Sequence, residues 1–302
     1  MQTTLYIIGF FLLGSLARKY ISAPSRVVGW MNTYIIYLAM PSIILLKIPA
    51  LSFDSQMLIP AGFAWAWAAI GCILMLCISR IFKFPKPLEG AVILLTVLGN
   101  TSFLGYPMVQ AYFSDEVLNY AIIYDQVGSF LMLSTVGVVI ISLYSPSSSG
   151  NTVSLLSVLK KVLSFPPFIA LLVAAMLPKQ PFAVDLAMTL TLLGSTLMPV
   201  ALVVIGLQFQ PQLLPEHRVP LGAAVTTKMI LAPMLAYAAL NCLNTSEAVM
   251  QATIFESAMP SMITPGIMAI QAGLAPRFCA TLLGYSTLFS FAWLPLIAAI
   301  IH

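Results

Sequence analysis

The amino-acid sequence predicts an all-α membrane protein with ten transmembrane helices, arranged as two inverted five-helix repeats in which the fourth and ninth helices are broken. Three observations lead to this fold class. The 302 residues are 60% hydrophobic and only 7% charged, whereas a soluble domain has about 25% charged residues. Ten apolar stretches approach the ~20 residues that a helix needs to cross a bilayer. Finally, prolines repeat at one interval in the two halves of the chain.

Short connections separate the predicted segments, so most of the chain is expected to lie in the membrane. In order, the segments span residues 3–18, 27–48, 57–82, 88–110, 116–144, 156–177, 183–208, 218–243, 247–273 and 276–301. The clearest linker is the polar stretch at residues 145–151, between segments five and six. We therefore divide the chain into a first repeat, residues 1–150, and a second repeat, residues 151–302.

Positive charges fall mainly on one side of this predicted topology. The loops after the odd-numbered segments hold Arg18, Lys19, Arg26, Arg80, Lys83, Lys86, Lys160, Lys161, Arg218 and Arg277, and the other loops hold Lys47 and Lys179. Lys and Arg concentrate on the cytoplasmic side, so both termini are expected outside. Since each half has an odd number of segments, the second half starts on the opposite side, which makes the repeats inverted.

Two pairs of prolines share an interval of 158 residues. Pro41 and Pro199 each follow a methionine, and Pro107 and Pro265 lie in segments four and nine. Proline removes a backbone donor and clashes with the preceding turn, so it breaks or kinks a helix. Matching breaks in two inverted halves point to a transporter binding site.

The residues around Pro107 and Pro265 support this interpretation. Residues 99–107 read Gly-Asn-Thr-Ser-Phe-Leu-Gly-Tyr-Pro, and residues 256–266 read Glu-Ser-Ala-Met-Pro-Ser-Met-Ile-Thr-Pro-Gly. Unwinding there frees backbone groups that lipid cannot satisfy. Half-helix N-termini favour an anion, and freed carbonyls can coordinate a cation. The alternative is that these prolines only kink packed helices.

Ionisable residues inside segments are a second indication, because a charge at the bilayer centre costs ~2.5–3.5 kcal/mol or more. Asp125 and Glu256 lie well inside segments five and nine, and we expect at least one to bind a cation or proton. For Asp125 the alternative is a structural hydrogen bond to the broken backbone. Gln126 adds an amide beside it. Lys228, inside segment eight, would snorkel to the surface, form an ion pair, or serve direct anion attraction or charge balance.

Other function classes find no support in the sequence. There is no Ser-His-Asp arrangement, nucleotide-binding loop or zinc signature, so we expect no enzymatic activity. No basic run with interleaved aromatics is present, so we expect no nucleic-acid partner. The lipid bilayer and a small solute are the expected partners.

Residues 99–107, with Tyr-Asp-Gln at 124–126, resemble the auxin efflux carrier family of membrane transporters. Leu-Ala-Met-Pro at 38–41 and Ala-Met-Pro at 258–260 add to the resemblance. It implies a fold of the bile-acid-symporter and sodium/proton-antiporter kind, with segments four and nine crossing near Pro107 and Pro265. Segments 1, 2, 6 and 7 would form a scaffold that makes a homodimer, and segments 3–5 and 8–10 a mobile transport domain.

The resemblance also implies residue roles. Asn100 matches the position that contacts a carboxylate substrate, and Gln126 resembles a polar support residue of the plant carriers. Glu256 matches the sodium-binding acid of the related bile-acid symporters. Segment three has no Asp or Glu and the linker is short, which favours a compact bacterial-type carrier of malate, malonate or similar carboxylates over a carrier of auxin.

We therefore expect a secondary transporter of small organic anions in a bacterial inner membrane, working by elevator-type alternating access. The expected substrate-binding residues are Asn100, Thr101, Ser102, Pro107, Met259, Thr264 and Pro265. The expected coupling residues, for a sodium ion or a proton, are Asp125, Gln126 and Glu256. No cofactor is expected apart from a sodium ion at Glu256. The alternatives are a membrane receptor or sensor that binds a ligand without moving it, and a channel.

Overall fold

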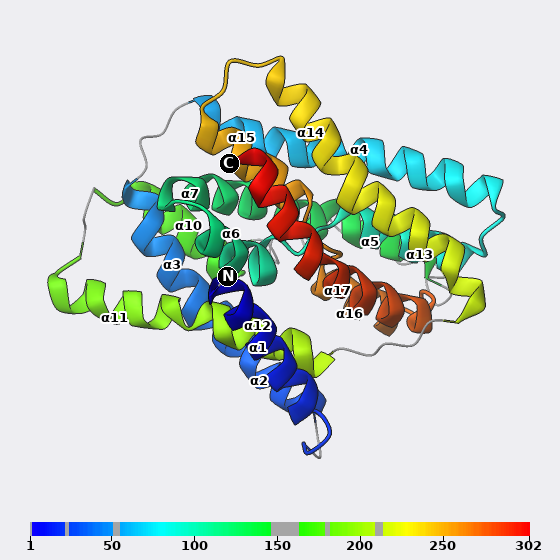
Figure 1. Cartoon of the computed structure of the whole chain (residues 1–302), viewed down its shortest axis with the longest axis horizontal. Coiled ribbons are helices and arrows are strands. Elements are labelled where there is room, and N and C mark those ends of the chain that lie inside the picture. The colour runs from blue at the N-terminus through cyan, green and yellow to red at the C-terminus, as the bar shows by residue number, and fades with distance from the viewer. Residues whose placement is uncertain (1, 22–23, 51–54, 146–162, 179–181, 209–213) are drawn as a thin grey trace.

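The structure, a computed structural model, describes residues 2–21, 24–50, 55–145, 163–178, 182–208 and 214–302. Every named element in these ranges is a helix of the α, 3₁₀ or π type (Figure 1). Lys160, Lys161, Lys179, most of the predicted linker and the start of predicted segment six lie outside the described residues.

The first half of the chain contains the following elements: α1 (Gln2–Ala17), α2 (Pro24–Tyr34), η1 (Ile35–Ala39), α3 (Met40–Lys47), η2 (Ile48–Ala50), η3 (Ser55–Met57), α4 (Leu58–Ile81), α5 (Lys86–Val97), η4 (Thr101–Gly105), α6 (Tyr106–Tyr112), α7 (Asp115–Ile123), η5 (Tyr124–Phe130), η6 (Leu133–Gly137) and α8 (Val138–Tyr144). The second half contains α10 (Pro166–Met176), α11 (Val184–Ser195), α12 (Leu197–Gln208), η7 (Pro215–His217), α13 (Arg218–Val225), η8 (Thr226–Leu231), α14 (Ala232–Asn241), α15 (Glu247–Ser257), α16 (Ile263–Gln271) and α17 (Pro276–Ile301).

Six of the helical stretches in the described chain are long and apolar enough to cross a membrane. They are Pro24–Lys47, Leu58–Ile81, Asp115–Tyr144, Val184–Leu207, Pro215–Asn241 and Pro276–Ile301. Two shorter apolar helices, Ile8–Ala17 and Pro166–Met176, match parts of predicted segments one and six. The structure thus supports the all-helical membrane class, with six full-length candidate spans in place of the predicted ten.

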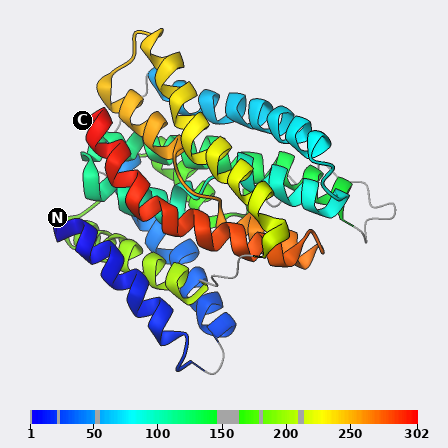
Figure 2. The same cartoon turned by 45° about the vertical axis from the view of Figure 1, so that its right-hand side comes forward.

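The helices pack as two groups. In one group, α12 packs on α1 and α2, while α3 packs on α10 and α11. In the other, α4 packs on α5, α15 packs on α7 and α14, and α17 packs on α16. Figures 1 and 2 show α1, α2 and α12 together at one side of the molecule.

Glycines allow α1 and α12 to approach closely. A Cβ on Gly14 would lie 2.2 Å from the Val203 carbonyl oxygen. A Cβ on Gly206 would likewise lie 2.2 Å from the Phe11 carbonyl oxygen. Only glycine fits at such distances. In a membrane the hydrophobic effect does not drive helices together, because lipid is as apolar as the helix surfaces. Close van der Waals packing takes its place, and small residues allow the two backbones to approach.

Predicted segments four and nine are both interrupted, and the interruptions meet. Residues 98–100 separate α5 from η4, and residues 258–262 separate α15 from α16. Gly99 and Ser261 form an antiparallel bridge. The Asn100 amide donates to the Pro260 carbonyl at 2.7 Å, and the Met262 amide donates to the Leu98 carbonyl at 2.9 Å. Lipid could not form hydrogen bonds with these backbone groups. In the structure, the groups of one interruption bond to those of the other instead. We call residues 98–100 and 258–262 the crossover.

The crossover does not lie at Pro107 and Pro265, where the resemblance placed it. Pro107 is the second residue of α6, and Pro265 is the third residue of α16. The first amides of a helix have no intrahelical partner, so Pro265 removes no hydrogen bond from α16, whereas Pro107 directly follows the π-helical turn η4 and Tyr106. Both prolines therefore follow their interruption: Pro265 lies in the first turn of the second half-helix, and Pro107 lies where the opening π-helical turn changes to α-helix.

Wide π-helical turns precede three prolines. η1, η4 and η8 end immediately before Met40-Pro41, Tyr106-Pro107 and Ala232-Pro233. A proline ring clashes with the carbonyl four residues before it, and a π turn changes the hydrogen-bond register at that place. Such turns are common at functional sites, and two of them, η4 and η8, carry residues of the candidate site described below.

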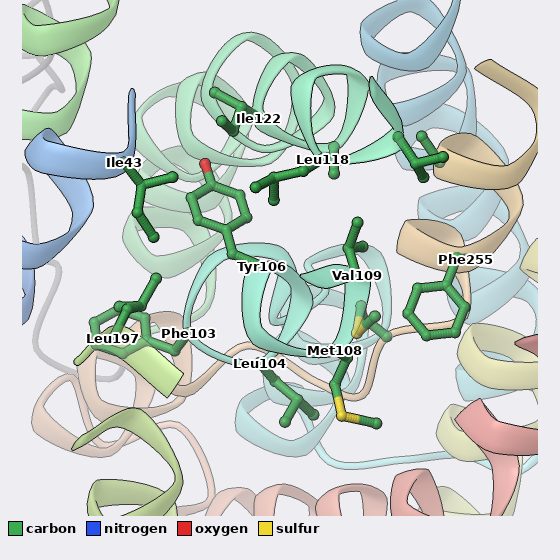
Figure 3. Packing of buried hydrophobic residues seen from close by; sticks show 14 of the residues in the cluster. Ile43, Phe103, Leu104, Tyr106, Met108, Val109, Leu118, Ile122, Leu197 and Phe255 are labelled. Atoms are coloured by element: carbon green, nitrogen blue, oxygen red, sulfur yellow. The ribbon is translucent and has the colours of Figure 1, made fainter. Parts of the chain in front are cut away.

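A buried apolar cluster surrounds the second half of the first broken helix. Figure 3 shows Tyr106, Met108 and Val109 of α6 beside Leu118 of α7 and Phe255 of α15. All five side chains are less than 2% exposed. This packing fixes α6 relative to α7 and α15, and so fixes the polar residues next to it.

Candidate functional site

A buried carboxylate, Asp125, organises the polar side chains beside the crossover. It accepts hydrogen bonds from the Thr101 hydroxyl at 2.5 Å, the Tyr106 hydroxyl at 2.8 Å and the Gln126 amide at 2.7 Å. The Gln126 amide also lies 3.2 Å from the Tyr106 hydroxyl. All four residues are buried. Donors to a carboxylate stabilise its charge, so the network joins η4 and α6 of the broken helix to η5.

Asn100 is the residue of the crossover whose side chain is free to bind something else. Its backbone amide is used by Pro260, and the residue is 0% exposed. Neither its amide nitrogen nor its amide oxygen has a hydrogen-bond partner. Buried polar groups without partners are rare and call for a ligand, a water molecule or a functional reason.

Glu256, in the last turn of α15, is a second buried acid of the site. It is 0% exposed, and neither carboxylate oxygen has a hydrogen-bond partner. The carboxylate lies against Gly105, where a Cβ would be 2.6 Å from Oε2. It interacts electrostatically with Asp125 and Lys228. Glu256 is thus close to η4 and has oxygen atoms available for a ligand.

Lys228, in the π-helical turn η8, reaches the crossover and not the membrane surface. Lys228 is only 2% exposed, and its ammonium donates a hydrogen bond to the Ser257 carbonyl at 2.9 Å. A Cβ on Gly99 would lie 2.9 Å from both Cε and Nζ of this lysine. The ammonium is also 5.9 Å from the centre of the Trp67 ring, within cation–π range. Snorkelling, one of the alternatives from the sequence, is therefore not observed.

The other predicted site residues lie at different distances from the crossover. Met259 is within it, fully buried beside Gly99, and Ser102 is buried in η4. Pro107 begins α6, while the half-buried Thr264 and the buried Pro265 belong to the first turn of α16.

Sequence reasoning missed the role of Tyr106. Its position in the quoted motif and its need for a hydroxyl partner inside a membrane were the available signals.

A pocket of about 700 Å³ lies between the two helix groups. Its polar lining includes Arg18 at the end of α1, with Ser25 and Asn32 of α2. Its other wall comes from α16 and α17, and includes Ile263, the first residue of α16. Ile263 directly follows the crossover residue Met262, but the residues of the candidate site itself do not line the pocket.

Several backbone carbonyls near Glu256 that a sodium ion could use already accept hydrogen bonds. Unwound backbone carbonyls are the usual sodium ligands at broken helices. Here the carbonyls of residues 98, 99, 100, 256, 257 and 260 each accept a hydrogen bond, the one at Ser257 from an ammonium group. Within the described residues, no three His, Cys, Asp or Glu side chains gather as metal ligands. The free oxygens of Glu256 are the feature that would suit such an ion.

Interrupted helices that meet inside an apolar helical protein, beside unpaired buried polar groups, are typical of membrane transporters. Comparison with known proteins agrees. The chain belongs to the auxin efflux carrier family: the family described as "Membrane transport protein" matches residues 1–298. The resemblance noted in the sequence is thereby confirmed.

Two archaeal relatives are each described as an uncharacterized transporter. The protein from Methanocaldococcus jannaschii is 27% identical over 270 residues, covering 86% of this chain and 85% of its own length. The protein from Methanothermobacter thermautotrophicus is 24% identical over 300 residues, covering 98% and 96%. The similarity to these transporters therefore extends over most of the chain.

Proposed function

We propose that this protein is a secondary transporter of small organic anions, such as malate, malonate or related carboxylates. The observation that carries the proposal is the fully buried Asn100 side chain at the crossover, with both polar atoms unpaired. A carboxylate can accept from its amide nitrogen. The half-helix that begins after Asn100 adds a positive helix end, which favours negative charge.

The coupling residues of this proposal lie behind the anion. Asp125 and Gln126 belong to the hydrogen-bonded network, and Glu256 has unpaired carboxylate oxygens. Coupling is to a sodium ion or a proton, because either would offset the charge of the substrate. Flux measured under imposed sodium and proton gradients distinguishes the two ions.

Elevator-type movement is part of the proposal. Under this proposal, the chain has ten transmembrane helices in two inverted repeats, residues 1–150 and 151–302. The group with α1, α2, α3, α10, α11 and α12 (segments 1, 2, 6 and 7) is the scaffold, and the group with the crossover is the mobile domain. The pocket between the groups supports this assignment, since a pathway for the solute has to run between the part that moves and the part that stays.

Orientation and assembly complete the proposal. The bias of Lys and Arg supports a plasma-membrane protein with both termini outside, and we propose a bacterial inner membrane. A homodimer would form through the scaffold group. Its lipid-facing helices expose large apolar side chains, among them Leu12, Leu13 and Leu16 of α1.

Substrate counterflow in proteoliposomes tests the function, with Asn100→Ala as the diagnostic variant. We expect the variant to fold normally, because its lost side chain has no hydrogen-bond partner in the protein. We expect its affinity for the transported anion to fall at least tenfold, which corresponds to ~1.4 kcal/mol. Asn241→Ala is the control, since Asn241 is exposed at the end of α14. Unaltered affinity in Asn100→Ala would remove this residue from the site.

The alternative is a membrane receptor that binds an anion without moving it. It shares the binding site but predicts no counterflow for any ligand that stabilises the protein. A channel is the third possibility, and it predicts conductance instead of saturable exchange. The interrupted, meeting helices favour a carrier over both, since a closed site between half-helices suits alternating access.

A further inference from the structure

The crossover contains a cation that belongs to the protein. Lys228 extends from η8 across Gly99, and its ammonium donates to the Ser257 carbonyl at 2.9 Å. Since Ser257 is the last residue of α15, its carbonyl has no partner further along that helix. A freed carbonyl at such a break is where transporters of this build coordinate a coupling cation.

The electrostatic surroundings explain why a buried ammonium is stable there. Two helices, α5 and α15, end at the crossover, and each C-terminal end carries about half a negative charge. The acids Asp125 and Glu256 add to this negative field, and Glu256 interacts electrostatically with Lys228. Trp67 offers its ring face to the ammonium. A buried cation without such partners would cost several kcal/mol.

The fit around the lysine is specific. A methyl group on Gly99 would lie 2.9 Å from both Cε and Nζ, so the end of the lysine side chain would have to move away. On its other side the lysine contacts the backbone of the second interruption through Ser257. One side chain thereby contacts both interrupted helices.

We infer that the Lys228 ammonium is the fixed cation of the crossover, occupying from within the protein the position that a sodium ion would take at the Ser257 carbonyl. The inference rests on the proposed function and selects within it: anion binding at this site does not depend on sodium. Lys228 is a positioning residue, since it holds the two interruptions and balances their charge without contacting the transported atoms.

Thermal melting of the purified protein without any organic anion tests the inference. Each variant is melted in sodium chloride and in choline chloride at equal ionic strength. We expect the wild type to melt at one temperature in both salts. We expect Lys228→Met to melt lower and to gain ~2 °C or more in sodium, because sodium can then bind the exposed carbonyl and the acids.

Three further variants make the result decisive. Lys228→Gln removes the charge and has a polar side chain one atom shorter than lysine, so the Ser257 carbonyl and the acids should again be open to sodium; it replaces the Met variant if that one does not fold. Lys228→Arg keeps the charge and should stay insensitive. Lys47→Met removes a lysine that pairs with the exposed Asp115 and should behave as the wild type.

A sodium shift in the wild type would overturn the inference, and so would the absence of a shift in both uncharged variants. No organic anion is present in these measurements, so they are independent of transport. If every carboxylate failed to exchange, the proposed function would fall while the melting data still decided the role of Lys228.

Discussion

Two buried acids of the same charge have opposite surroundings in this site. Asp125 accepts from three donors, whereas both oxygens of Glu256 lack a hydrogen-bond partner. Donors make an ionised carboxylate tolerable in an apolar interior, and their absence makes it costly. The two acids therefore differ in their partners: Asp125 is hydrogen-bonded to the broken helix, and the oxygens of Glu256 are available to a ligand or a proton.

Replacement of Asp125 by Asn should lower stability as well as transport. An amide can offer only one oxygen, and its NH₂ group would face a hydroxyl or amide donor in the network. Each buried group left unsatisfied costs ~1–3 kcal/mol, which should lower the melting temperature by several degrees.

The control is Asp115→Asn, because Asp115 is an acid with a 75% exposed side chain that pairs with Lys47. Exposed ion pairs contribute ~0–1 kcal/mol, so this variant should melt nearly as the wild type. Equal melting of the two variants would contradict a structural role for the Asp125 network.

The individual site residues were predictable to different degrees. Asn100, Asp125 and Glu256 could be found because polar residues inside apolar segments are conspicuous in any membrane sequence. The partner of Lys228 could not be found, since it is the backbone carbonyl of Ser257, and no side-chain pattern marks a carbonyl. The contact between Gly105 and Glu256 depends on how two distant helices pack, which the sequence does not encode locally.

Among the helices, the interruptions were predictable in existence but not in position. Proline and glycine marked segments four and nine correctly, yet the breaks precede Pro107 and Pro265 by several residues. A proline is tolerated in the first turn, as at Pro265, whereas Pro107 marks the change from the π-helical turn to α-helix inside the second half-helix. The π-helical turns η1, η4 and η8 precede a proline, but η5 and η6 do not, and a widened turn uses the same residue types as the helix around it.

The packing of α1 on α12 gives a prediction for a single helix contact. Gly14→Ala places a Cβ 2.2 Å from the Val203 carbonyl oxygen, so the two helices have to separate. Overpacking of this kind costs ~1–3 kcal/mol, and thermal melting in detergent should detect it.

A matched control exists in the same helix. A Cβ on Gly9 would have nothing within 4 Å, and alanine is the better helix former. Gly9→Ala should therefore melt at or slightly above the wild-type temperature. If Gly14→Ala were equally harmless, the close approach of α1 and α12 would not hold in the protein.

The arrangement of the whole molecule links the charge bias to the pocket. Arg18 and Ser25 line the pocket, and they belong to the loop that the charge count assigns to the cytoplasm. The pocket extends from there to Ile263, next to the crossover. In the proposed transport cycle, this arrangement corresponds to the state that exchanges substrate with the cytoplasm.

Cysteine labelling tests this orientation. In a chain with Cys72, Cys77, Cys242 and Cys279 changed to Ala, Ser25→Cys should react with a membrane-impermeant thiol reagent from the cytoplasmic side only. A transported anion should slow the reaction by changing the population of this state.

Ser114→Cys serves as the matched position on the other face. Ser114 is exposed just before α7, in the loop after segment four, and should react from outside. Labelling of Ser25→Cys from outside, or of both positions from one side, would reverse the assigned topology.

The pairing of the two interruptions has a consequence for biosynthesis. The backbone partner of Asn100 is Pro260, which a ribosome adds only after some 160 further residues, roughly 8–30 s later at ordinary rates. Until then the nascent first half has to remain in the bilayer with backbone groups that lipid cannot satisfy. The amino-terminal half is thus a waiting intermediate during insertion, and completion of the crossover is the step at which the newly made chain becomes a finished protein.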